Sequence, residues 1–135
     1  MFKYLKTIGA HSGAAEIERM PVEASAIIPK NCLCEMNMGY LSNTYNEHKT
    51  KFVTLEDKSE NDGKNYIDCI RALPGMIFEC DFIGSIENVG IGSLINAGNE
   101  PDNYYDHCED GSGDIEIVDI STYAKTNRIK VTFHC

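Results

Sequence analysis

Short runs in which apolar and polar side chains alternate occur along most of the chain. One face of the run 76–82 carries Met76, Phe78, Cys80 and Phe82, and Glu79 and Asp81 fall between them. The run 129–135 repeats the pattern with Ile129, Val131, Phe133 and Cys135 on one face. Residues two apart lie on the same face of a strand. Such runs therefore predict half-buried strands and leave little room for long helices.

Turn-forming residues separate the alternating runs. The predicted strands are 16–26, 31–38, 51–56, 65–73, 76–83, 114–120 and 127–134. The intervening turns contain Pro29-Lys30-Asn31, Asp62-Gly63, Pro74-Gly75 and Asp110-Gly111-Ser112-Gly113. Pro21 interrupts the first run, which predicts an edge or bent strand there. We therefore expect a mainly β fold, a compact antiparallel β-barrel or β-sandwich.

The length and composition indicate one globular unit with a distinct N-terminal segment. A chain of 135 residues, 42% hydrophobic and 24% charged, is typical of a single folded domain. Gly9 and Gly13 set the first 15 residues apart from the alternating runs. We therefore predict an N-terminal arm over residues 1–15 and a single β domain over residues 16–135.

The charge balance argues against nucleic acid as a partner. The formal net charge is -9, and the 12 basic residues are scattered among 21 acidic ones. Nucleic-acid binding depends on Lys and Arg that neutralise phosphates, so we expect no such binding. The chain shows neither a signal peptide nor the roughly 20 apolar residues of a membrane span. We expect no membrane contact, and synthesis in a reducing cytosol.

The six cysteines are interpreted as reduced core residues. Cys32, Cys34, Cys69, Cys80 and Cys135 fall in phase with the apolar faces of predicted strands, and a free cysteine behaves as a small apolar residue. Structural zinc sites need pairs spaced as C-x₂₋₄-C. The single C-x-C at Cys32 and Cys34 does not supply that spacing. A structural metal therefore remains the less favoured alternative.

Other candidate sites fail on spacing. Gly90-Ile91-Gly92 resembles a dinucleotide loop, but Ile95 occupies the position of the required third glycine. The acidic stretch 102–110 could offer oxygen ligands to calcium, but an EF-hand loop starting at Asp106 would place Cys108 at its third position. A solvated loop is the simpler interpretation, and cation binding there stays open.

Catalysis is also not indicated. His11, His48, His107 and His134 could each meet a cysteine in space, but no nucleophile motif such as G-x-S-x-G supports this. We therefore predict that the protein is not an enzyme, with no catalytic, cofactor-binding or metal-binding residue.

Several segments resemble the small capsid decoration proteins of tailed bacteriophages. The first is Ile28-Pro29-Lys30-Asn31-Cys32-Leu33-Cys34-Glu35-Met36-Asn37-Met38-Gly39-Tyr40-Leu41. The others are Phe52-Val53-Thr54-Leu55-Glu56, Asp62-Gly63-Lys64, Ile67-Asp68-Cys69-Ile70-Arg71, Pro74-Gly75-Met76-Ile77-Phe78-Glu79 and Arg128-Ile129-Lys130-Val131-Thr132-Phe133. The resemblance covers residues 16 to 134 and consists mainly of turn and core positions.

The resemblance implies a structural role on the virion. Such proteins coat the outer capsid surface, bind the major capsid protein and reinforce the shell, after synthesis in the bacterial host cytoplasm. Self-association on the capsid lattice is also implied. The apolar residues of the predicted arm, Phe2, Tyr4, Leu5 and Ile8, are the candidate contacts with the capsid or a neighbouring copy. An ordinary edge strand is the equally weighted alternative for this segment. The alternatives are a tail or head-fibre component and, less favoured, a small metal-binding module.

Overall fold

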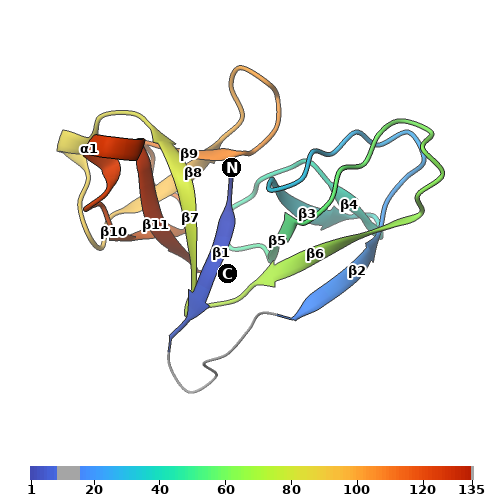
Figure 1. Cartoon of the computed structure of the whole chain (residues 1–135), viewed down its shortest axis with the longest axis horizontal. Coiled ribbons are helices and arrows are strands. Elements are labelled where there is room, and N and C mark those ends of the chain that lie inside the picture. The colour runs from blue at the N-terminus through green and yellow to red at the C-terminus, as the bar shows by residue number, and fades with distance from the viewer. Residues whose placement is uncertain (9–15, 135) are drawn as a thin grey trace.

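The structure, a computed structural model, describes residues 1–8 and 16–134 and is built mainly from β-strands. Two β-sheets lie side by side (Figure 1). The only helices in the described residues are the short η1 (Ile86–Asn88) and α1 (Tyr123–Thr126). Neither has the length or apolar character needed to cross a membrane.

The strands divide between the two sheets. In order across the six-stranded sheet they are β1 (Lys3–Thr7), β7 (Met76–Ile83), β11 (Arg128–Phe133), β10 (Ile115–Asp119), β8 (Leu94–Gly98) and β9 (His107–Glu109). The order in the five-stranded sheet is β2 (Ile17–Pro21), β6 (Tyr66–Ala72), β5 (Lys51–Thr54), β3 (Leu33–Asn37) and β4 (Tyr40–Ser42). The mainly β fold is therefore confirmed.

The larger sheet closes on itself into a five-stranded barrel. One edge of β7 pairs with β11, while Asp81–Ile83 of β7 pairs with β9 in parallel. The β7–β9 pairing closes the ring β7-β11-β10-β8-β9. β1 pairs with the first half of β7, outside this ring. The structure is therefore a barrel with a second sheet beside it, and the β7–β9 pair departs from the expected antiparallel pattern.

In the five-stranded sheet, β5 and the first three residues of β3 are buried on both faces. Leu33 of β3 and Val53 of β5 belong to the apolar core shared with the barrel. Their neighbours Cys34 and Phe52 belong to a second core enclosed by the curled five-stranded sheet. Because successive side chains point to opposite faces, the two sheets pack through β3 and β5 and leave no water-facing side on these residues.

The first residues of the predicted N-terminal arm pair with the barrel sheet. Residues 3–7 form β1, in which Thr7 pairs with Met76 of β7. Phe2 is fully buried, and its ring lies 6.0 Å from that of Phe133. Burial of Phe2 in the barrel core and pairing with β7 make residues 3–7 an edge strand of the barrel sheet. Residues 9–15 of the predicted arm lie outside the described residues.

Candidate functional sites

The four predicted contact residues do not form one exposed surface. Phe2 is buried in the barrel core, and Tyr4 and Leu5 are half-buried. Ile8 alone of the four is largely exposed, at 59%. A capsid contact through Phe2 would require the barrel core to open, and a contact through Tyr4, Leu5 or Ile8 stays a prediction.

All five described cysteines are buried free thiols, as the strand patterns predicted for four of them. Burial raises the pKa of Cys32 to about 11 and that of Cys69 to about 12. Cys108, which sequence reasoning placed in a solvated loop, lies instead on β9 with its Sγ 3.3 Å from that of Cys80. Cys135 lies outside the described residues.

These thiols should resist modification in the folded state. The thiolate is the reactive form, and burial disfavours it while also blocking access. Mixed with a thiol-specific reagent at pH 8, the native protein should leave the five described cysteines unmodified, and all should react once guanidinium is added. Residue-resolved mass spectrometry checks this, and rapid native labelling of Cys32 or Cys69 would contradict the burial described here.

The described histidines and the acidic loop do not assemble a metal-binding group. No group of three or more His, Cys, Asp or Glu side chains converges within the described residues in a way that could hold a metal ion. His107 contacts Asp106 at 2.8 Å, and His134 contacts Glu116 at 2.6 Å. The stretch 102–110 ends in β9, so it is only partly a solvated loop.

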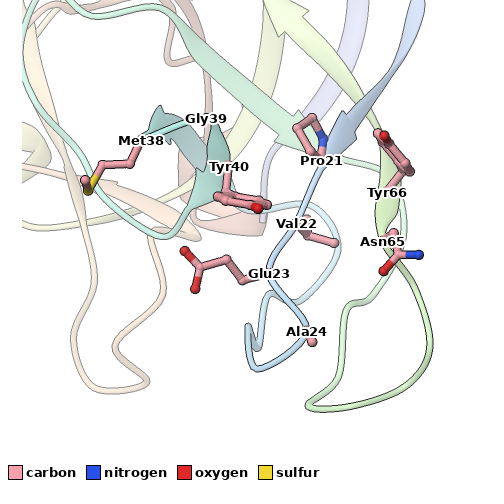
Figure 2. A pocket seen from close by; sticks show the side chains of 9 residues that line it. All are labelled: Pro21, Val22, Glu23, Ala24, Met38, Gly39, Tyr40, Asn65 and Tyr66. Carbon is pink, nitrogen blue, oxygen red and sulfur yellow. The ribbon is translucent and has the colours of Figure 1, made fainter.

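An open groove lies between β2 and β4, the two edge strands of the five-stranded sheet. Its wider part, about 750 Å³, is lined by Pro21, Val22, Glu23, Ala24, Met38, Gly39, Tyr40, Asn65 and Tyr66. A second part continues along Tyr40–Ser42, opposite Ala26–Ile28. Tyr66 is 52% exposed and Tyr40 42% exposed. We call this surface the β2–β4 groove (Figure 2).

The β3–β4 hairpin shapes this groove and presents an unpaired strand edge to it. Met38 and Gly39 form its two-residue turn, both with positive φ, and Asn37 pairs with Tyr40. In such hairpins the closing pair exchanges hydrogen bonds, so the backbone N–H and C=O of Leu41 point away from β3. No other strand in the described residues pairs with that edge of β4. Figure 2 shows the Tyr40 side chain toward Val22, while Met38 projects to the other side of the hairpin.

Three buried charged side chains and one half-buried tyrosine form a cluster where the two sheets meet. The cluster consists of Lys51 on β5, Glu35 on β3, Asp114 just before β10, and Tyr45 in the connecting loop; we call it the Lys51 cluster. Lys51 Nζ lies 2.8 Å from Asp114 Oδ2 and 3.9 Å from Glu35 Oε2, and all three side chains are inaccessible to solvent. Lys51 Nζ also donates to the carbonyl oxygens of Asn46 and Lys49.

Hydrogen bonds satisfy both carboxylates of this cluster. Glu35 accepts from the backbone N–H of Asn46 at 2.7 Å and from the Asn46 and Thr44 side chains. Asp114 accepts from the Tyr45 hydroxyl and from the backbone N–H of His48. Burial by itself raises the pKa of Asp114, but the bonds from Lys51, Tyr45 and His48 outweigh it and hold the pKa below its usual value.

The cluster also fixes an irregular segment. Residues 43–50 connect β4 to β5, and their backbone groups supply donors to Glu35 and Asp114 and acceptors to Lys51. The Tyr45 ring lies 4.9 Å from Lys51 Nζ, and burial, followed by the hydrogen bond to Asp114, raises the Tyr45 pKa. Residues 43–50 are therefore held in place by the buried charges of Glu35, Lys51 and Asp114. The sequence pattern does not identify these charges as buried.

A second buried lysine organises the loops beyond the other end of the sheet. Lys58 Nζ donates to the carbonyl oxygens of Ala24 and Ala26 and lies 3.0 Å from Asp62 Oδ1. Hydrogen bonds from the Ser59 and Lys64 backbones lower the pKa of Asp62 to about 2. Lys58 thus sets the course of segment 24–26, which borders the β2–β4 groove.

Comparison with models of known protein families, with curated proteins and with solved structures finds no match to this chain.

Proposed function

We propose that this protein decorates the outer surface of a tailed-phage capsid by binding the major capsid protein, and that the β2–β4 groove is its docking surface. The observation that carries the proposal is the groove itself, where exposed aromatic side chains flank an unpaired strand edge. Aromatic residues are enriched in the contacts that dominate protein–protein affinity. The sequence resemblance supports the choice of partner.

The occupant that fits this groove is an extended segment of the capsid protein. A free strand edge binds an added strand through main-chain hydrogen bonds. The backbone N–H and C=O of Leu41 offer such bonds, and Tyr40 and Tyr66 flank the path with apolar surface. Glu23, the charged residue among those lining the groove, favours a segment with a basic residue at that position.

Binding also suits a particle with repeated sites. A single groove offers a modest contact area, but many copies on a symmetric lattice gain affinity through simultaneous contacts. The net charge of -9 keeps such closely spaced copies soluble.

Co-sedimentation with undecorated, expanded capsids tests the proposal. The protein should pellet with the capsids, saturating at a fixed ratio to the major capsid protein. The double variant Tyr40→Thr/Tyr66→Thr should bind at least about tenfold more weakly, because two aromatic contacts of about 1 kcal/mol or more are lost. The matched control is Ile83→Thr/Ile91→Thr, which changes two exposed apolar residues, 57% and 73% accessible, outside the groove.

The result of the co-sedimentation experiment distinguishes capsid decoration from the alternative functions. Retention by tails or fibres, with no capsid binding, would favour the other structural role in the virion. Failure to bind any particle would overturn the proposed function. Capsid binding that both double variants retain would keep the function but remove the groove from it.

A further inference from the structure

The Lys51 cluster brings together the groups that an amide condensation requires. Its amine and its two carboxyl groups belong to side chains without solvent access, and the half-buried Tyr45 adds a hydroxyl donor. We propose that Lys51 and Asp114 condense without an external catalyst, so that an amide bond joins Lys51 Nζ to Asp114 Cγ and one water molecule is released. The proposal depends on intramolecular contacts alone and is independent of capsid binding.

The fold brings the Lys51 amine and the Asp114 carboxyl group into contact. Lys51 and Asp114 are separated by 63 residues, yet Nζ lies 2.8 Å from Oδ2. Both side chains are immobilised, Lys51 by two backbone carbonyls and Asp114 by Tyr45 and the His48 N–H. Reacting groups held in this way reach effective concentrations of about 10⁵–10⁸ M in favourable cases. Exclusion of water also disfavours the reverse hydrolysis.

The first step is a proton transfer within the ion pair. An ammonium group has no lone pair and a carboxylate is a poor electrophile, so the ionised pair is unreactive. Transfer of one proton from Nζ to Oδ2, along their existing hydrogen bond, gives a neutral amine beside a neutral acid. The transfer also removes two charges from a site with no solvent, where each charge is costly.

The remaining steps balance without any other reagent. The Nζ lone pair attacks Cγ, and the π electrons of the Cγ–Oδ1 bond move to Oδ1. Glu35, 3.9 Å from Nζ, accepts the proton that the attacking nitrogen sheds and delivers it to the Oδ2 hydroxyl. The Cγ–Oδ2 bond then breaks, Oδ2 leaves as water, and the Cγ–Oδ1 double bond re-forms. Glu35 ends as the carboxylate it began as.

Tyr45 supplies the donor that the intermediate needs. Its hydroxyl already donates to Asp114 Oδ1, the oxygen on which negative charge develops. The raised pKa of Tyr45, caused first by burial and then by its contact with Asp114, keeps that hydroxyl protonated. The donor is therefore in position before the reaction starts.

The presence of Glu35 distinguishes this site from a simple ion pair. Asp114 alone would neutralise Lys51, whereas Glu35 leaves the solvent-free cluster with one excess negative charge. Glu35 accepts hydrogen bonds from Asn46 and Thr44, and a condensation also needs a base that is not itself the electrophile. Because the Asp114 pKa is lowered, the neutral pair is a minor species, and the bond should accumulate slowly after folding.

Intact-mass measurement of the full chain, denatured and reduced after ageing in the folded state, tests the proposal. The aged protein should be lighter by one water, and proteolysis should yield a branched peptide joining the segments that carry Lys51 and Asp114. Lys51→Arg keeps a cation but lacks a nucleophilic amine, so it should retain full mass. Glu35→Gln keeps one side-chain oxygen that can accept from the Asn46 backbone N–H, so this variant should fold, and it should lose water far more slowly than the unaltered protein.

Each contrary result has a defined meaning. Full mass in the aged protein overturns the proposal. Water loss that persists in Lys51→Arg also overturns it, because cyclisation at Asp62-Gly63 or Asp110-Gly111 removes the same mass within a single peptide. Condensation of Glu35→Gln at the original rate would remove Glu35 from the role of base.

Discussion

Lys51→Met should lower the free energy of unfolding by roughly 3–5 kcal/mol, the range found when one partner of a buried ion pair is removed. The substitution keeps the length of the side chain but leaves Glu35 and Asp114 as two carboxylates without solvent or counter-charge. It also removes the donor to the Asn46 and Lys49 carbonyls. Urea unfolding at pH 7, followed by circular dichroism, measures the change.

The difference in unfolding free energy between Lys51→Met and the unaltered protein should decrease as the pH is lowered. In the unaltered protein the pKa of Asp114 is lowered, so its contribution to stability is present above the pKa of about 3.9 of an unfolded aspartate and is lost as the pH falls through the lower folded value. In Lys51→Met, burial without a cation raises the carboxyl pKa values. The folded variant then binds protons more readily than its unfolded chain and gains stability as the pH falls. The two proteins should therefore converge between pH 7 and about 4.

Two controls sharpen this result. Lys130→Met changes a lysine on the surface of β11, which faces Asp119 at 3.6 Å with both side chains about one-third exposed, and should cost at most about 1 kcal/mol. Adding Glu35→Gln and Asp114→Asn to Lys51→Met should recover part of the loss, because no buried charge remains. Equal effects of Lys51→Met and Lys130→Met would contradict the burial of the cluster.

Phe2→Ala should destabilise the fold by about 3–5 kcal/mol, the range for a buried phenylalanine reduced to alanine. The side chain is fully buried, contacts the ring of Phe133, and its backbone N–H donates to the Asn31 carbonyl at 2.9 Å. Removing it leaves a cavity between β1 and the barrel core. Chemical denaturation gives the free energy of unfolding.

Ile8→Ala is the matched control for this substitution. Ile8 is 59% exposed and lies just beyond β1, so its truncation should change stability by no more than about 0.5 kcal/mol. If Phe2→Ala proved as mild as Ile8→Ala, the first residues would behave as the detached arm that the glycine positions suggested, and their place in the barrel sheet would be wrong.

Alternation predicted the longer strands, and it failed where strands are short or lack large apolar residues. All seven predicted runs contain a strand of the structure, and β7 spans the predicted 76–83. The three residues of β4 are too few to show a period, although Met38-Gly39 could have marked its turn. The residues that β8 and β9 direct into the core are Ile95, Ala97 and Cys108, too few and too small to show a clear period, and their pairing with distant strands is a tertiary property.

The alternation of apolar and polar residues could not predict the Lys51 cluster. Alternation places Glu35 on the face opposite Cys34, and in a half-buried strand that face would be exposed to solvent. In the structure both faces of β3 are covered at this position, one by the barrel and the other by the curl of its own sheet. Glu35 is inside because the two sheets meet there. Sequence periodicity cannot reveal which strands a second sheet will cover.

The position of β1 governs when the barrel can be completed during synthesis. Thr7 pairs with Met76, and all five strands of the second sheet are translated between them. At about 5–20 residues per second, the ribosome leaves β1 without its partner for several seconds, with Phe2 exposed to solvent. The second sheet emerges first and has its own enclosed core, so it is ready to collapse before β7 arrives. The nascent chain therefore has to keep β1 unpaired until β7 emerges, and β1 is most open to chaperones and to unwanted strand pairing in that interval.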